Sequence, residues 1–184
     1  MHQVVITLGS NIDKERNLPA AVRLLAEGAE VVAVSPVYET APVGPAGQPP
    51  FLNAAVLLRT DQSAAALKDG LLRRVEAQLG RQRTDDRYAP RPIDTDIALY
   101  DDAVFDYTPA DGRPRHVPDP GLIHFAHCLL PVADLLPDMP HPETGQPLAA
   151  LAAPLRRDPT IRLRPDVGVM NEPRIFTDLT DDTD

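Results

Sequence analysis

Two aspartates separated by one residue, Asp94 and Asp96, lie in the stretch IDTDIALY. Alternating apolar positions predict a strand there, and side chains two apart on a strand point to the same face. The neighbours expected on the opposite face are Ile93, Thr95, Ile97 and Leu99. Two carboxylates held this close repel each other, and a divalent cation such as Mg²⁺, which prefers oxygen ligands, would relieve the repulsion. The alternative is that both side chains lie on a solvated sheet face.

The residues just before the aspartates are rich in arginine: the stretch GRQRTDDRYAPRP contains Arg81, Arg83, Arg87 and Arg91. A planar guanidinium can bind phosphate oxygens through two hydrogen bonds, so arginines beside a metal-binding carboxylate pair favour a site for a polyphosphate joined to Mg²⁺. Clustering without function is the alternative, because arginine supplies nearly all of the 18 basic residues. The sequence has neither G-x-x-x-x-G-K-[ST] nor G-x-G-x-x-G, so both glycine-rich phosphate cradles are excluded.

The composition is that of one acidic globular domain. The chain has 184 residues, 43% hydrophobic and 24% charged, which is enough for one core and too short for two ordinary domains. Its net charge of −9 argues against binding nucleic acid or an anionic membrane through the overall field. The single Cys128 cannot form an internal disulfide, and we find no leader pattern and no apolar run of the ~20 residues that cross a bilayer. We therefore expect a cytoplasmic protein.

The first part of the sequence predicts a strand followed by a helix. Residues 3–8, QVVITL, form a short β-branched run that is typical of a buried strand. Leu18, Val22 and Leu25 follow at helical spacing, and Pro19 is tolerable if it lies in the first helical turn.

Three more strands and a second helix follow. The strands are expected over residues 30–40, where Pro36 indicates an edge or a bulge, over 51–60 and over 93–100; the helix is expected over 63–80, with Ser63 as its N-cap and Gly80 as its stop. Residues 41–50, which are rich in proline, predict a shaped loop. The order β-α-β-β-α-β is the ferredoxin-like α+β arrangement, an antiparallel sheet with both helices on one face.

C-terminal additions to this arrangement are also predicted. We expect a short hairpin near residues 103–117 and a helix near 129–135. The segment 148–184 is basic and then acidic, and it has two alternatives: packing on the body or remaining disordered.

Several motifs together resemble one family, the 6-hydroxymethyl-7,8-dihydropterin pyrophosphokinases of folate biosynthesis. In the order of that family they are LGSN at 8–11, VYETAPVG at 37–44, QPPFLNAAV at 48–56, VEAQLGR at 75–81 and GRQRTDDRYAPRPIDTDIALY at 80–100. The resemblance covers about residues 3–140 and implies a kinase-like domain at 1–147 with an extension at 148–184. It implies transfer of pyrophosphate from ATP to the hydroxymethyl oxygen of the pterin, with AMP as the other product.

The resemblance also implies roles for individual residues. Asp94 and Asp96 would hold two Mg²⁺ ions. The catalytic set would be Arg81, Arg91, Asp94 and Asp96, and the ATP-binding set Glu76, Arg81, Arg83, Arg91, Ile97 and Arg115. The pterin-binding set would be Gly9, Thr40, Pro42, Val43, Phe51, Asn53 and His127. The loops 41–50 and 80–92 would be lids that exclude water.

Three positions depart from the family pattern in VPDPGLIHFAHCLLPV, residues 117–132. Asp119 stands where the family has a phosphate-side histidine, Phe125 where it has an arginine, and His127 where it has a second stacking ring. Arg113 and Arg115 could compensate for the lost cations, and a neutral His127 ring can still stack on a pterin.

Alternative functions remain open at this point. One is a divergent relative that acts on another heterocyclic alcohol, and another is a non-catalytic ferredoxin-like binding module. His124, His127 and Cys128 invite a zinc interpretation, which we disfavour because no second ligand pair stands at a suitable spacing.

Overall fold

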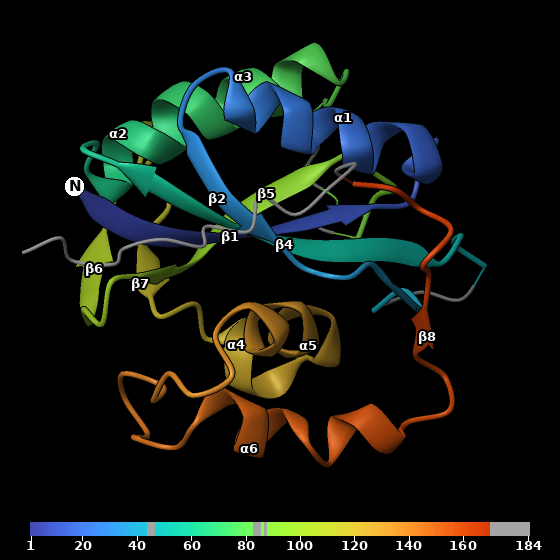
Figure 1. Ribbon diagram of the computed structural model, residues 1–184. Coiled ribbons are helices and arrows are strands. Elements are labelled where there is room, and N and C mark those ends of the chain that lie inside the picture. Colours follow the sequence, from blue (N-terminus) through green and yellow to red (C-terminus); the bar gives the residue numbers. More distant parts are fainter. Residues whose placement is uncertain (44–46, 83–85, 87, 170–184) are drawn as a thin grey trace, which may run out of the picture.

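Six strands form one antiparallel sheet in the computed structural model (Figure 1), which describes residues 1–43, 47–82, 86 and 88–169. The strands are β1 (His2–Ser10), β2 (Glu30–Val34), β3 (Tyr38–Thr40), β4 (Phe51–Thr60), β5 (Asp94–Tyr100) and β8 (Arg162–Leu163). They are ordered β5-β1-β4-β3-β8, and β2 also pairs with β4. Strand β1 is therefore central, paired with β4 on one side and with β5 on the other.

Helices cover both faces of this sheet (Figure 1). The upper face carries α1 (Lys14–Ala26) and a second helix composed of α2 (Ala64–Leu67), a π-helical turn η1 (Lys68–Leu72) and α3 (Arg73–Gln78). The lower face carries α4 (Gly121–His124) and α5 (Ala126–Leu135), and α6 (Leu148–Ala152) packs against α5 on the side away from the sheet. The ferredoxin-like arrangement is confirmed, and the C-terminal additions form a third layer.

The apolar runs of the central strands supply both cores. In β1, Val4, Ile6 and Leu8 pack with α1 and the second helix, whereas Val5 packs with α5 on the other face. Because side chains alternate along a strand, a strand with helices on both faces must be apolar at nearly every position. This explains why residues 3–8 and 51–60 read as continuous apolar runs.

The first helix and the strand after it differ from the sequence expectations. Helix α1 begins at Lys14, so Pro19 lies in the second turn and not in the first; the helix continues through it with one backbone hydrogen bond fewer. The strand expected over residues 30–40 is two strands, β2 and β3, because Pro36 lies in the gap between them and cannot donate to a ladder.

The second helix and β5 also contain local irregularities. The expected cap is confirmed, since Ser63 Oγ accepts a hydrogen bond from Ala66 N, but the π turn η1 interrupts the helix. In β5 the expectation for Leu99 was wrong: it lies in the lower core with Val5. The register with β1 shifts between Val5 and Ile6, and the resulting bulge turns Leu99 to the other face.

The remaining elements follow β5 along the chain. The predicted hairpin is confirmed as β6 (Phe105–Tyr107) and β7 (Arg115–Val117). Beyond α6, a 3₁₀ turn η2 (Leu155–Arg157) leads to β8, which pairs with β3. Residues 148–169 therefore pack on the body. Within the described residues no helix is both long and apolar enough to span a membrane.

Candidate active site

The candidate site lies where one end of β1 meets the ends of its neighbours. Gly9 of β1 is paired with Asn53 of β4 on one side and with Asp94 of β5 on the other. Thr40, the last residue of β3, is paired with Phe51 at the start of β4. The sheet register thus brings together residues that are widely separated in the sequence.

Asp94 and Asp96 share a face at the start of β5, as predicted. Their side chains are 24% and 41% exposed, whereas Thr95 between them is fully buried and hydrogen-bonds Glu76. The carboxylates therefore reach the surface of the site, while the residue between them fixes the strand to the second helix.

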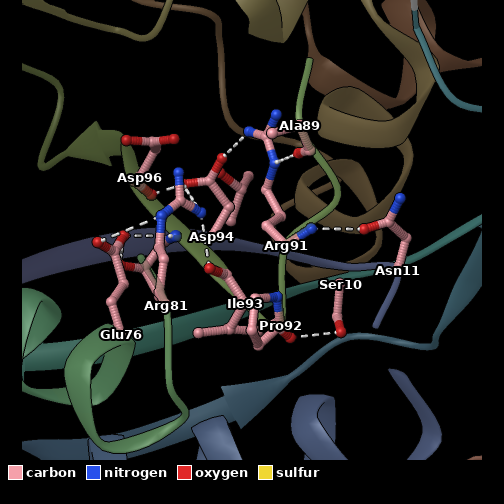
Figure 2. A network of polar contacts seen from close by, with 12 residues as sticks. Ser10, Asn11, Glu76, Arg81, Ala89, Arg91, Pro92, Ile93, Asp94 and Asp96 are labelled. Atoms are coloured by element: carbon pink, nitrogen blue, oxygen red, sulfur yellow. Dashed lines mark hydrogen bonds and ion pairs between the residues drawn. The ribbon is translucent and has the colours of Figure 1, made fainter. Parts of the chain in front are cut away.

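Asp94 is held between two arginines (Figure 2). Arg81 Nη1 lies 2.9 Å from Asp94 Oδ1, and Arg91 Nη1 lies 2.5 Å from Asp94 Oδ2. Arg81 also donates to Ile93 O at 2.6 Å, so its guanidinium is oriented by the backbone next to the acid. Guanidinium groups positioned in this way are suited to bind an anion with defined geometry.

Asp96 has a different counter-ion, Lys68, whose Nζ lies 3.0 Å from Asp96 Oδ1. Lys68 lies in the π turn η1 of the second helix. Burial alone would raise the pKa of Asp96, but the charge and hydrogen bond of Lys68, with smaller effects of Arg115 and Arg81, lower it below its usual value. Asp96 is therefore ionised at neutral pH. Lys68 was not among the predicted site residues.

A first cavity of about 230 Å³ contains most of the residues predicted to bind the pterin. Its wall includes Gly9, Thr40, Val43, Phe51, Asn53, His127, Arg91, Asp94 and Asp96. Pro42 is not on that wall. Asn53 Nδ2 donates to Thr40 Oγ1 at 3.0 Å, and a Cβ at Gly9 would come 3.4 Å from Asn53 Oδ1. The glycine thus allows the amide oxygen to lie close to β1.

Phe125 also lines this cavity, which sequence reasoning missed. It was matched to an arginine of the nucleotide side, but its ring stacks on that of His127 with centroids 5.2 Å apart. Burial lowers the pKa of His127, so the imidazole is neutral at physiological pH. The sequence did contain a signal for this role, because Phe125 is an aromatic residue two positions before His127, the expected stacking ring.

A second cavity, of about 180 Å³, is lined mainly by charged groups. They include Lys68, Arg81, Arg91, Arg113, Arg115, Asp86, Asp94 and Asp96. Asp94, Asp96 and Arg91 line both cavities, so the two spaces share a wall. The predicted Arg83 lies outside the described residues, as does Arg87.

Two predicted ATP-side residues lie away from this second cavity. Ile97 lines a third cavity together with Arg115 and Asp119. Glu76 is only 3% exposed and accepts hydrogen bonds from Thr95 N and Oγ1. It therefore links the second helix to β5 on the buried side of the strand. Burial and then the charge of Asp96 raise the pKa of Asp119, which is the acid that stands where the family has a histidine.

Asn11 connects the two loops beside the site, a role that the LGSN motif could have suggested. Its Oδ1 accepts from Arg91 N at 2.7 Å, and its Nδ2 donates to Pro49 O at 3.4 Å. Gln48 Nε2 adds a second link by donating to Tyr88 O at 2.6 Å. The described parts of the loops 41–50 and 80–92 are therefore hydrogen-bonded to a common support.

The aspartate pair has the chemistry of a divalent cation site. Both side chains line the wall shared by the two cavities, and carboxylate oxygens are ligands that Mg²⁺ prefers. Among the described residues there is no group of three or more His, Cys, Asp or Glu that could hold a metal. Further ligands for a bound cation would have to come from elsewhere, for example from phosphate oxygens.

Comparison with known proteins agrees with these features. The family model for 7,8-dihydro-6-hydroxymethylpterin-pyrophosphokinase matches residues 5–137. The chain is 37% identical over 157 residues to the 2-amino-4-hydroxy-6-hydroxymethyldihydropteridine pyrophosphokinase of Pseudomonas aeruginosa, covering 83% of this chain and 91% of that protein. It is 38% identical to the protein of the same name from Bacillus subtilis, covering 71% and 75%.

Longer proteins contain a similar region. The chain is 37% identical over 146 residues to the folic acid synthesis protein fol1 of Schizosaccharomyces pombe, covering 78% of this chain but only 19% of that protein. A solved structure of Plasmodium falciparum HPPK-DHPS has the same fold, with a TM-score of 0.63 at 14% identity over 84% of this chain and 44% of the other. The extent of the family match and the identity to single relatives show that the chain belongs to the 7,8-dihydro-6-hydroxymethylpterin-pyrophosphokinase family.

Proposed function

We propose that this protein transfers a pyrophosphoryl group from ATP to the hydroxymethyl oxygen of 6-hydroxymethyl-7,8-dihydropterin, giving AMP and the pterin diphosphate for folate biosynthesis. The observation that supports this most directly is the wall shared by the two cavities. Asp94 and Asp96 separate an aromatic cavity of the size of a heterocycle from a cavity rich in arginine. An acceptor and a polyphosphate bound in these spaces would meet at the carboxylates.

The first cavity has the groups needed to bind a flat, polar heterocycle. Phe51, Phe125 and His127 provide ring faces, and Asn53 provides an amide held in place by Thr40. Stacking supplies contact area with little conformational cost, and the amide supplies directional hydrogen bonds. We place the pterin there, with its hydroxymethyl group toward the aspartates.

The second cavity would receive the triphosphate. Arg81 and Arg91 now neutralise Asp94; when ATP binds, their guanidinium groups would move from the carboxylate to phosphate oxygens. Mg²⁺ held by Asp94 and Asp96, as two ions, would supply charge neutralisation at the reacting phosphates. The residues of the chain would position both substrates in line and exclude water, which is most of what phosphoryl chemistry requires.

An assay of AMP formation from ATP and the hydroxymethyl pterin tests the proposal. The wild type should produce AMP and pterin diphosphate in equal amounts, and Asp96→Ala should reduce kcat by at least about a hundredfold, as is typical when one group that stabilises the transition state is removed. Arg59→Ala, on the distant end of β4, serves as the control and should retain activity. No pterin-dependent AMP formation by the wild type would refute the proposal.

A second candidate is the same transfer to a different heterocyclic alcohol. It is favoured by Phe125, which enlarges the aromatic wall where the family has an arginine. Calorimetry in the presence of a non-hydrolysable ATP analogue separates the two candidates, since micromolar binding of the hydroxymethyl pterin supports the first. Pyrophosphoryl transfer to another alcohol without pterin binding supports the second.

A further inference from the structure

Lys68 is a buried lysine at the floor of the charged cavity. Its side chain is only 1% exposed, although Lys68 lines the second cavity. Removing a lysine charge from water costs several kcal/mol unless acceptors and an opposite charge compensate it. Its retention at this position therefore needs an explanation in terms of its neighbours.

The acceptors around Lys68 are well defined. Nζ lies 3.0 Å from Asp96 Oδ1 and 3.6 Å from Glu76 Oε1, and it donates to Thr95 O. The ammonium group thus donates hydrogen bonds to one carbonyl and one carboxylate and forms a longer ion pair with a second carboxylate. The lysine is fixed on three sides by β5 and by its own helix.

Lys68 lies on the buried face of the second helix. Leu67 and Lys68 are both buried, as are Leu71 and Leu72. Residues three and four positions apart share one face of a helix, so these four side chains all face the sheet. Leu67 and Leu71 fill the core, while Lys68 points to the start of β5.

The counter-ions of the two aspartates differ in their exposure to solvent and in their freedom to move. Arg81 and Arg91, which neutralise Asp94, are 14% and 22% exposed and can exchange the carboxylate for phosphate. Lys68 cannot leave, because its helix is packed in the upper core. It occupies Asp96 Oδ1, while Asp96 Oδ2 accepts no hydrogen bond from the described residues and the side chain is 41% exposed.

We propose that Lys68 is a positioning residue, a permanent counter-ion that orients Asp96 and makes divalent-cation binding depend on the nucleotide. This inference rests on the proposed function. With one carboxylate oxygen held and its charge balanced, the aspartate pair binds a divalent cation weakly by itself. The cation binds tightly only when phosphate oxygens supply further ligands and negative charge, so the cation and ATP arrive together.

The test is a titration of Mn²⁺ alone, followed by electron paramagnetic resonance, on the wild type and on Lys68→Met. Methionine has a similar length without the charge. Removing one positive charge a few ångströms from the cation should tighten binding of Mn²⁺ alone about tenfold. Addition of a non-hydrolysable ATP analogue should strengthen Mn²⁺ binding greatly in the wild type and much less in Lys68→Met.

Arg59→Met is the matched control. It also removes one positive charge, from a residue of β4 that is paired with Glu30 at 3.4 Å and lies at the far end of the sheet. Its affinity for Mn²⁺ alone should equal that of the wild type. A purely structural role of Lys68 would change stability but not the affinity for the metal.

A variant with Glu76→Gln in addition to Lys68→Met covers the case in which the single variant does not fold, because it removes a buried acid together with the base. It should still bind Mn²⁺ alone several times more tightly than the wild type. Unchanged affinity in the folded variant overturns the role of Lys68, as does a wild type that binds Mn²⁺ equally well with and without nucleotide. If the wild type binds neither Mn²⁺ with nucleotide nor the pterin, the proposed function itself fails.

Discussion

Asp119 brings an acid close to Asp96, in the third cavity that also contains Arg115. Its Oδ1 accepts a hydrogen bond from Gly121 N at 2.6 Å, which an asparagine could retain. Burial and the charge of Asp96 raise its folded-state pKa above 3.8. Ionisation of Asp119 therefore costs stability as the pH rises through the folded pKa, whereas below pH 3.8 the acid is protonated in both the folded and the unfolded chain.

We predict that Asp119→Asn stabilises the protein at neutral pH. The gain in the free energy of unfolding should be present at pH 7 and should shrink as the pH falls below the folded pKa of Asp119. Urea denaturation at pH 7 and pH 4.5 measures it. An equal gain at both pH values would mean that the effect does not come from ionisation of Asp119.

Phe125 gives a second prediction, because it faces the aromatic cavity although it is matched to an arginine of the nucleotide side. Phe125→Ala should raise the dissociation constant of the pterin about tenfold, since a lost ring contact costs ~1 kcal/mol beyond buried area. The KM for ATP should change little. Ile123→Ala, which removes an exposed apolar side chain of α4, is the control, and a change confined to the KM for ATP would contradict this placement.

The link between β8 and β3 positions the strand that leads into the loop 41–50. Arg164 Nη1 lies 2.7 Å from Glu39 Oε2, and Lys14 Nζ lies 2.8 Å from the same oxygen. A hydrogen bond from Lys14, together with the charges of Lys14 and Arg164, lowers the pKa of Glu39 in spite of its partial burial. The C-terminal strand is thus tied to β3 through a shared carboxylate.

Arg164→Ala should therefore weaken both stability and pterin binding. We expect a loss of about 1 kcal/mol in the free energy of unfolding, reduced from the value of a buried charged hydrogen bond because the pair is partly exposed. The KM for the pterin should rise severalfold with little change in kcat, because Thr40 ends β3. Thermal denaturation and steady-state kinetics measure the two effects; Arg162→Ala, at an exposed position of β8, is the control.

The elements show which parts of the fold the sequence can reveal. Continuous apolar runs, alternation at residues 93–100 and helical spacing predicted the strands and helices of the ferredoxin-like core, because each pattern is local. The π turn at Lys68 and the bulge that reverses Leu99 were missed, since both depend on how β5 meets the second helix and β1. Lysine is normally exposed, so the burial of Lys68 could not be recognised from its residue type.

The sequence could predict those site residues that belong to one short motif. Asp94, Asp96, Arg81 and Arg91 stand close in sequence and come together in space. Phe125 and Lys68 could not be placed in this way, because only the third layer and the second helix bring them to the cavities. Tertiary packing determines where these two side chains lie, and short sequence motifs do not contain that information.

The charge distribution of the whole molecule explains how an acidic chain can receive a polyphosphate. The net charge is −9, yet Lys68, Arg81, Arg91, Arg113 and Arg115 converge on one cavity. A concave site with low-dielectric walls concentrates its local field, so nearby cations outweigh the distant acids. Binding of ATP should consequently weaken as salt is added.

Ligand binding should stabilise the whole fold, because the cavities are built from β1, β4, β5 and the second helix together. At a hundred times its dissociation constant, a nucleotide analogue with Mg²⁺ should add ~2.7 kcal/mol to the free energy of unfolding. For a chain of this size that corresponds to an increase in Tm of about 5–10 °C. Scanning calorimetry with and without Mg²⁺ measures the effect.

Paired variants show whether the stabilisation comes from the aspartates. Asp94→Asn with Asp96→Asn should remove the Mg²⁺-dependent part of the increase in Tm, because amide oxygens carry no charge to hold the cation. Binding of the analogue without metal should remain or improve, since Arg81 and Arg91 would no longer be neutralised by Asp94. An increase in Tm that is the same with and without Mg²⁺ in the wild type would show that the arginines alone hold the phosphates and that the aspartates serve only to orient them.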